Sequence, residues 1–325
     1  MIDRLEMFIA LARERHFGRA AEACGVTQPT LSSAIRQLEE SLGVQLVFRG
    51  SRFQGLTPEG QRVLEHARRI TTEARSLRDE MRAVRAGLSG KLRLGVIPTA
   101  LAMAAELTGP FCARHRGVHV TILSRSSAEI LREIEATELD AGITYLDGEP
   151  LGRVETVPLY VERYRLLVAA TEAVAGRETI GWAEVAAQPL ALLTGDMQNR
   201  RIVDRWLAAA GAAPAPRLES NSIVALVAHV ARGGWASVLP EKLAGLFAAD
   251  PGLRAVPISG GGHAVGLVVQ PRAPHTPVLQ ALLEAARRGE ASEGGRGEAA
   301  EGGRGEAAEG GCLPPVASGD PPEDI

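Results

Sequence analysis

The chain has few cysteines, few aromatic residues and no long hydrophobic run, and each scarcity excludes a class of protein. Its 325 residues include three cysteines, at positions 24, 112 and 312, and aromatic residues make up 4% of the total. Three widely spaced cysteines are too few for a disulfide-stabilised secreted scaffold and suit a reducing compartment. The sequence has no apolar run of transmembrane length and no apolar signal region at its N-terminus, so we expect a cytoplasmic protein that does not enter a membrane.

An excess of positive charge is also missing. The formal net charge is −3, and the first 60 residues hold seven arginines against seven acidic residues. A strongly basic domain is the usual electrostatic signature of nucleic-acid binding. Any binding to DNA must therefore depend on the geometry of a motif rather than on bulk charge, and we expect modest non-specific binding.

The sequence motifs of common catalytic and cofactor sites are absent as well. The chain has no glycine-rich phosphate-binding loop, no nucleophile elbow and no zinc-protease motif. His115 and His119 straddle the junction between a predicted helix and a predicted strand, which is poor geometry for a metal ion. Asp204 with Arg200 or Arg201 has the spacing of a surface ion pair on a helix. We predict no catalytic residue, no metal and no cofactor, and an enzyme stays an alternative only.

What the sequence does contain is a pair of short helices joined by a tight turn, between residues 15 and 43. Gly25 suits the left-handed end of the first helix, Thr27 can cap the second, and Pro29 falls in the first turn, where a missing N–H costs nothing. An apolar stripe along the second helix consists of Leu31, Ile35, Leu38 and Leu42. The opposite face carries hydroxyls, amides and an arginine, which suit base edges in the major groove of DNA. The alternative is an ordinary helical hairpin whose polar face meets only water.

The flanking segments favour a helix-turn-helix over that hairpin. An earlier amphipathic helix containing Leu5, Phe8, Ile9 and Ala12 can cover the pair. After Gly43, residues 44–57 form two apolar runs around a Gly/Ser/Arg turn, similar to a small wing that would place arginines on DNA phosphates.

Here the sequence resembles the N-terminus of LysR-type transcriptional regulators. The matching residues, in order, are Phe8, Ala20, Ala21, Val26, Thr27, Gln28, Pro29, Leu31, Ser32, Ile35, Leu38, Glu39, Leu42, Gly43, Leu46, Val47, Phe48, Arg49, Leu56, Thr57, Pro58, Glu59 and Gly60. Ser33 departs from the pattern, because many members carry arginine there, so no base preference is carried over at that position. The candidate DNA-binding residues are Gln28, Pro29, Thr30, Ser32, Ser33, Arg36, Arg49 and Arg52.

The segment from Pro58 to Leu88 has a strict seven-residue hydrophobic repeat. Thr57, Pro58 and Glu59 make a good helix start, with a cap, a proline and an acid at the positive end of the helix dipole. Such an a/d pattern over more than three repeats indicates a coiled coil, and in the family it pairs two subunits. The alternative is one long helix packed on its own domain. The candidate dimerisation residues, called the seam below, are Val63, Ala67, Ile70, Ala74, Leu77, Met81 and Val84.

Beyond Gly90, short apolar strands alternate with helical segments, which predicts an α/β fold with a mainly parallel sheet. This resembles the regulatory region of the same family, which has two Rossmann-like lobes, similar to periplasmic binding proteins, joined by two crossover strands. We place the crossings near residues 159–167 and 264–269. The predicted organisation is a winged helix-turn-helix at 1–58, a linker helix at 59–89, lobe I at 90–161 and 265–288, lobe II at 162–264, and a disordered Gly/Glu/Ala-rich tail at 289–325.

Polar residues at the carboxyl ends of strands and the starts of helices are the candidate ligand contacts of this region. Helix N-termini at such positions favour anions. The candidate effector-binding residues are Thr99, Ser126, Ser127, Thr144, Gln198, Asn199 and Asn221. By resemblance, Thr99, Ser126, Gln198 and Asn199 face an effector between the lobes. Each can also serve a local role; Ser126 with Glu129, for example, fits a capping box.

These observations predict a sequence-specific transcriptional regulator controlled by a small anionic effector, such as formate or another small carboxylate. The expected partners are double-stranded DNA with dyad symmetry, a second copy of the chain in a dimer or tetramer, and the effector, with RNA polymerase as a further candidate and no membrane. A small-molecule sensor or solute-binding protein without an operator is the main alternative. It would leave the helix-turn-helix unexplained.

Overall fold

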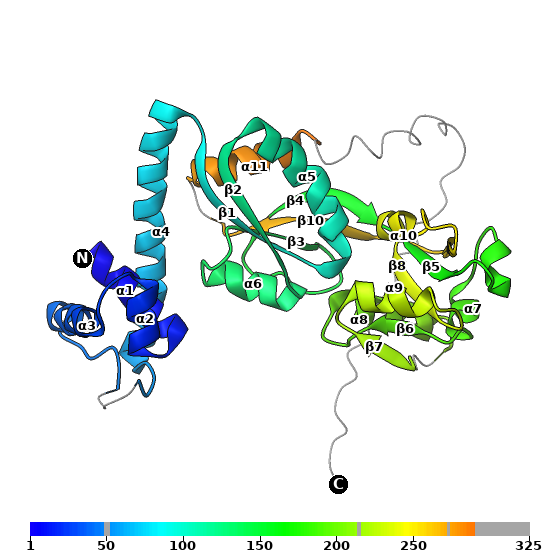
Figure 1. Cartoon of the computed structure of the whole chain (residues 1–325), viewed down its shortest axis with the longest axis horizontal. Coiled ribbons are helices and arrows are strands. Elements are labelled where there is room, and N and C mark those ends of the chain that lie inside the picture. The colour runs from blue at the N-terminus through cyan, green and yellow to red at the C-terminus, as the bar shows by residue number, and fades with distance from the viewer. Residues whose placement is uncertain (49–52, 213–215, 272–273, 290–325) are drawn as a thin grey trace, which may run out of the picture. The chain divides into compact units, whose positions relative to one another are not determined.

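The N-terminal domain is a bundle of three short helices. The structure, a computed structural model, describes residues 1–48, 53–212, 216–271 and 274–289 (Figure 1). The helices are α1 (Ile2–Glu14), α2 (Phe17–Ala23) and α3 (Gln28–Leu42). Thr27 caps α3 by accepting a bond from the N–H of Thr30, and Gly25 and Gly43 take the left-handed conformations (φ 66° and 70°) that end α2 and α3. The predicted helix-turn-helix is confirmed.

The core of this domain contains most of the predicted apolar stripe of α3. Leu31, Ile35 and Leu38 are fully buried against Phe8 and Leu11 of α1. Leu42 departs from the prediction, since it is 42% exposed at the last turn of α3. A single antiparallel bridge between Val47 and Leu56 closes the base of the small wing.

Helix α4 (Pro58–Ala86) is the predicted linker helix. It starts at a capped turn, where the N–H of Gly60 donates to the hydroxyl of Thr57 at 2.9 Å. Its first turns pack on α1, and Ala67 is completely buried in the core of the N-terminal domain. Further along α4, Ile70, Leu77 and Met81 are 47%, 59% and 53% exposed.

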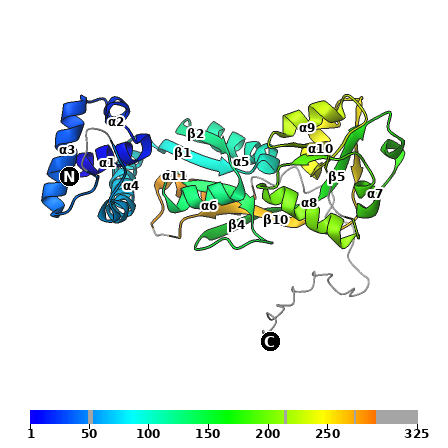
Figure 2. The ribbon, with the colours of Figure 1, turned by 90° about the horizontal axis from the view of Figure 1, so that it is seen from below.

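Lobe I is a five-stranded sheet with helices packed on it. The strand order is β2-β1-β3-β10-β4, in which β1, β2 and β3 are parallel and β10 is antiparallel to both of its neighbours. Figure 2 shows β10 beside β4 in this sheet. Its elements are β1 (Ser89–Val96), a 3-10 turn (Pro98–Ala100), α5 (Leu101–Arg114), β2 (Gly117–Ser124), α6 (Ser127–Glu135), β3 (Ala141–Tyr145), β4 (Glu155–Glu162), β10 (His263–Val269) and α11 (Pro277–Arg287).

Lobe II is built on β5, which pairs antiparallel with both β8 and β9, while β6 and β7 are parallel. The prediction of a mainly parallel sheet is therefore wrong for the three-stranded part of this lobe. Its elements are β5 (Tyr164–Ala169), a 3-10 turn (Ala173–Gly176), α7 (Trp182–Ala186), β6 (Ala191–Leu193), α8 (Gln198–Ala209), β7 (Leu218–Ser220), α9 (Ile223–Val230), β8 (Ala236–Pro240), α10 (Glu241–Phe247) and β9 (Leu253–Pro257).

Two segments connect the lobes. The first passes from β4 into β5 across Arg163, inside the predicted range 159–167. The second lies between the end of β9 at Pro257 and the start of β10 at His263, earlier than the predicted 264–269. Residues 264–269 are apolar because they already form a buried strand of the lobe I sheet. None of the described helices is long and apolar enough to cross a membrane.

Candidate DNA-binding surface and effector cleft

The outer face of α3 presents polar side chains to solvent. Gln28, Thr30, Ser33 and Arg36 are exposed, as is Pro29, whereas Ser32 is half-buried. The polar contacts that the structure gives these side chains are local, such as 2.9 Å between the hydroxyls of Thr27 and Thr30. A helix face of this kind can exchange water for base edges at little cost. Arg49 and Arg52, the predicted phosphate contacts, lie outside the described residues.

A narrow cleft lies where the ends of β1, β3 and β6 meet the starts of α6 and α8. The cavity volume is about 10 Å³, which is room for about one water molecule, so a larger occupant must move the lining side chains apart. Its lining is electrically neutral and consists of Ile97, Pro98, Thr99, Ser126, Ser127, Tyr145, Leu193, Met197, Gln198 and Asn199. We call these ten residues the effector cleft.

The structure brings five of the seven predicted effector residues to this cleft. Thr99, Ser126, Ser127, Gln198 and Asn199 all line it, and all five are buried. The two remaining residues do not line it. Thr144 is completely buried behind Ser127, to which it donates a hydrogen bond of 2.9 Å, and Asn221 is exposed at the turn before α9. The prediction that Thr144 and Asn221 form part of the lining is therefore not supported.

The polar groups of the cleft already bond to one another or to the backbone. The Nε2 of Gln198 donates to the carbonyl of Asp147 at 3.1 Å, and the Nδ2 of Asn199 donates to the hydroxyl of Tyr145 at 3.1 Å. Ser126 forms the predicted capping box with Glu129, and the bond from the Ser126 N–H holds the pKa of the Glu129 carboxyl below its usual value. A ligand must therefore use remaining lone pairs and N–H groups or replace existing bonds.

The predicted effector-binding residues leave out five others that line the cleft: Ile97, Pro98, Tyr145, Leu193 and Met197. Tyr145 ends β3 and has a fully buried side chain whose hydroxyl lies 3.4 Å from Thr99 Oγ1. Its position directly after Thr144 at the carboxyl end of a strand was the available signal. Leu193 and Met197 supply apolar surface, which carries no sequence pattern distinct from that of the core.

Arg200 corrects a further prediction. The expected surface ion pair with Asp204 is present at 2.7 Å, but Arg200 is buried and also bonds to Glu219 and to the carbonyl of Leu193 at 2.9 Å. Arg201 pairs instead with Glu149 at 2.7 Å. Arg200 therefore ties α8 to β6 and β7 and supports the wall that carries Gln198 and Asn199.

The seam on α4 divides into two parts. Val63 and Ala67 pack in the core of the N-terminal domain, and Ala67 has no exposed surface left for a partner. Ile70, Leu77 and Met81 are exposed in the single chain, and Ala74 is half-exposed. Nothing is described of the side chain of Val84. The free apolar surface of the seam thus begins later than the heptad pattern suggested, because α1 covers its first turns.

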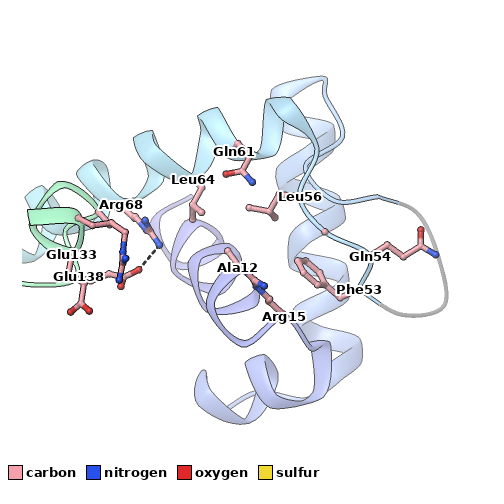
Figure 3. Close-up of a pocket in the computed structure, with 13 residues that line it drawn as sticks. Ala12, Arg15, Phe53, Gln54, Leu56, Gln61, Leu64, Arg68, Glu133 and Glu138 are labelled. Atoms are coloured by element: carbon pink, nitrogen blue, oxygen red, sulfur yellow. Dashed lines mark hydrogen bonds and ion pairs between the residues drawn. The ribbon is translucent and has the colours of Figure 1, made fainter. Parts of the chain in front are cut away.

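A second and wider hollow lies against the N-terminal domain (Figure 3). It is lined in part by Ala12 and Arg15 of α1, by Phe53 and Leu56, and by Leu64 of α4. The dashed line in Figure 3 marks the ion pair between Arg68 and Glu138, at 2.7 Å.

Within the described residues, no group of three histidine, cysteine or acidic side chains is placed to hold a metal ion.

Two family models match the chain. Residues 2–61 match the model described as a bacterial regulatory helix-turn-helix protein of the lysR family, and residues 85–291 match the LysR substrate binding domain. The chain is 30% identical over 297 residues to the DNA-binding transcriptional dual regulator OxyR of Escherichia coli K12, covering 88% of this chain and 94% of that one. It is 32% identical over 244 residues to a probable hydrogen peroxide-inducible genes activator of Streptomyces viridosporus, covering 74% and 77%.

Solved structures agree with these matches. A full-length OxyR variant from Pseudomonas aeruginosa has a TM-score of 0.69 at 26% identity, covering 88% of this chain and 94% of that one. CbnR, a LysR family regulator solved in complex with its target DNA, shares the fold with a TM-score of 0.63 at 23% identity, covering 89% and 99%. The chain therefore belongs to the LysR family of bacterial regulatory helix-turn-helix proteins, and its relatives are transcriptional regulators rather than enzymes.

Proposed function

We propose that this regulator binds a dyad-symmetric operator through the outer face of α3 and takes a small organic anion in the effector cleft. The main support for the effector site is the cleft lining, in which hydroxyls and amides gather near the starts of α6 and α8 and none of the ten lining side chains is acidic. The Glu129 carboxyl already caps the start of α6, so the start of α8 is the helix end left for an anion. Free N–H groups and the helix dipole favour anions at such positions. The domain boundaries given above belong to the same proposal.

For the DNA-binding surface, Gln28, Thr30 and Ser33 lie nearest the bases, with Arg36 beside them and Arg49 and Arg52 on the phosphates. Support for Gln28, Thr30, Ser33 and Arg36 comes from their exposure on the face of α3 opposite its buried stripe. A side chain that contacts bases contributes about 1–3 kcal/mol of discrimination, whereas one on phosphate weakens binding to all sequences alike.

The test is a nuclease footprint on the DNA upstream of the protein's own gene, with and without pools of small organic acids. A symmetric protected site whose boundaries change with one pool supports both halves of the proposal. Gln28→Ala should lose preference for that site over random DNA, and Arg49→Ala should lose affinity for both and flatten the salt dependence by about one unit. If Gln28→Ala lowers the affinity for the specific site and for random DNA equally, Gln28 does not contact the bases.

The exposed part of the seam is the proposed dimer contact. Two copies of α4 that pair through Ile70, Leu77 and Met81 would bury apolar side chains that single chains leave in water. Leu77→Asp should shift the protein to monomers in analytical ultracentrifugation, and Arg78→Asp, an exposed neighbour outside the seam, should leave the dimer intact. Dimers that survive Leu77→Asp would contradict this seam. RNA polymerase, expected as a further partner, would be tested on the same operator.

The relatives named for hydrogen peroxide suggest a second stimulus. A disulfide within the effector region would need two cysteines there, and residues 90–288 contain only Cys112. Cys24 lies in the N-terminal domain, where burial raises the pKa of its thiol and so lowers its reactivity. These facts favour a bound effector over a disulfide within that region.

A further inference from the structure

All three tyrosines of the chain surround one buried carboxyl group. Glu162, the last residue of β4, is 2% exposed. Tyr145 from β3 donates a hydrogen bond to its Oε1, and the Tyr160 hydroxyl lies 3.4 Å from its Oε2. Tyr164, the first residue of β5, is close enough that the charge of Glu162 raises the pKa of its phenol. The carboxyl thus lies at the first connection between the lobes.

The charged groups around Glu162 do not compensate its negative charge. None of the described lysine, arginine or histidine side chains forms an ion pair with it. His263, opposite Glu162 in the β4–β10 ladder, bonds to Asp147 at 2.9 Å, and Lys242 of α10 pairs with Glu106 of α5 at 3.0 Å. Burial, together with the charge of Asp147, raises the pKa of Glu162 to about 7.

Tyr145 connects this carboxyl to the effector cleft. Its hydroxyl bonds to Glu162, accepts from Asn199 Nδ2 at 3.1 Å and lies 3.4 Å from the hydroxyl of Thr99. Thr99 and Asn199 both line the cleft. One hydroxyl group therefore couples a buried acid to two candidate ligand contacts.

The hydroxyls of Tyr145 and Thr99 each carry one hydrogen, so the direction of the hydrogen bond between Glu162 and Tyr145 affects that of the bond between Tyr145 and Thr99. When Glu162 is ionised, Tyr145 donates to it and can only accept from Thr99; a Thr99 hydroxyl that donates to Tyr145 offers only lone pairs to the cleft. When Glu162 takes a proton from solvent, the acid can donate to the Tyr145 oxygen, and Tyr145 can donate to Thr99. The hydrogen of Thr99 is then free to bond to a ligand.

We propose that Glu162 is a positioning residue that sets, through Tyr145, whether Thr99 presents a donor or an acceptor to the effector. An anionic effector, which needs donors, then binds together with one proton taken up by Glu162. This inference rests on the proposed binding of a small anion in the cleft. Its direct consequence is that affinity falls by as much as tenfold per pH unit above the pKa of Glu162.

The first arm of the test needs no effector. Infrared difference spectra of the full-length protein between pH 5.5 and 8.5 should contain a protonated carboxyl band that Glu162→Gln removes. Tyr145→Phe should shift the titration of that band to higher pH, since the carboxylate loses its donor, and Thr99→Val should shift it less in the same direction. Thr108→Val is the matched control, because Thr108 is a buried threonine bonded only to a backbone carbonyl.

The second arm uses acetate as the probe in titration calorimetry, in buffers of different ionisation heat at pH 6.5 and 7.5. Wild type should take up a proton on binding and bind acetate more weakly at pH 7.5, and Glu162→Gln should do neither. Binding of acetate without proton uptake would overturn the inference and leave the anion site standing. Failure of acetate to bind would count against the anion site. The infrared arm would still test Glu162, because a missing carboxyl band, or a band whose titration does not change in Tyr145→Phe, overturns the inference.

Discussion

The α3 surface and the effector cleft use the same residue types in opposite states. On α3, glutamine, threonine and serine side chains are mostly exposed and make only local contacts. In the cleft, glutamine, asparagine, threonine and serine side chains are buried and bonded to one another or to backbone. A buried polar group left without a partner costs about 1–3 kcal/mol, so each of these bonds helps to hold the cleft in place.

The difference bears on how each site can act. An exposed surface exchanges water for ligand with no rearrangement, which suits binding to many related DNA sequences. A cleft whose bonds are already satisfied binds only an occupant that restores every bond it breaks. Selectivity for an effector therefore depends on matching these bonds. Among them, the bonds of Tyr145 to Thr99 and Asn199 reach Glu162 at the first connection between the lobes.

The largest expected effect concerns the support beneath the α3 surface. Leu31→Ala should destabilise the N-terminal domain by about 2–5 kcal/mol, because Leu31 is fully buried. Leu42→Ala is the matched control in the same helix and should cost much less, because Leu42 is 42% exposed. Hydrogen exchange by mass spectrometry over residues 1–48 measures both, and similar losses of protection would contradict the assigned core.

The pH dependence of stability tests the buried acid that the effector cleft contacts through Tyr145. The pKa of Glu162 is raised to about 7 in the folded protein, so between its unfolded value of 4.5 and about 7 the folded state holds a proton that the unfolded state releases. Stability from this group is complete below pH 4.5 and is lost as the pH rises towards 7, by up to about 1.4 kcal/mol per pH unit. Urea unfolding followed by tryptophan fluorescence should show this slope in wild type and a flatter one in Glu162→Gln. Parallel profiles would contradict a proton on the buried acid.

A smaller effect tests the start of α3. Thr27→Ala should cost about 1 kcal/mol, because the N–H of Thr30 loses the acceptor that caps the helix. Thr27→Ser keeps the hydroxyl and should recover most of that loss. Circular dichroism during thermal unfolding gives the comparison, and equal stability of the two variants would mean that the cap contributes nothing.

The smallest effect is expected at Cys112, an exposed residue of α5. Cys112→Ser should change stability by less than about 0.5 kcal/mol and leave any effector response unaltered. Operator binding measured before and after treatment with hydrogen peroxide should be the same in wild type and variant. A peroxide-dependent change in operator binding that is present in wild type and absent in Cys112→Ser would mean that oxidation of this thiol is the stimulus.

The helix-turn-helix was predictable because its signals are local. Thr27, Pro29 and Gly43 each act within one turn of α3, and a spacing of three or four residues suffices to place Leu31, Ile35 and Leu38 in the core. Leu42 was misplaced because the periodicity continues to the last residue of α3, where the side chain is 42% exposed. The same limit applies to the seam, where a heptad pattern cannot distinguish packing on α1 from packing on a partner.

The cleft was only partly predictable because its members come from distant segments. The resemblance supplied Thr99, Ser126, Gln198 and Asn199, but no local pattern links Tyr145 to them. Glu162 escaped notice because a glutamate at the end of a strand is ordinarily solvated, and only the folded sheet brings three tyrosines around it. The antiparallel strands of lobe II were missed for a similar reason, since strand direction depends on where the chain returns.

The position of β10 has a consequence for biosynthesis. It lies between β3 and β4 in lobe I, yet the chain reaches it only after the whole of lobe II has been made. On the ribosome, β3 and β4 must therefore wait for about a hundred residues before the strand that joins them emerges. Late pairings of this kind leave strand edges open during synthesis and make folding slow. A nascent chain that stops short of residue 269 cannot complete the five-stranded sheet of lobe I.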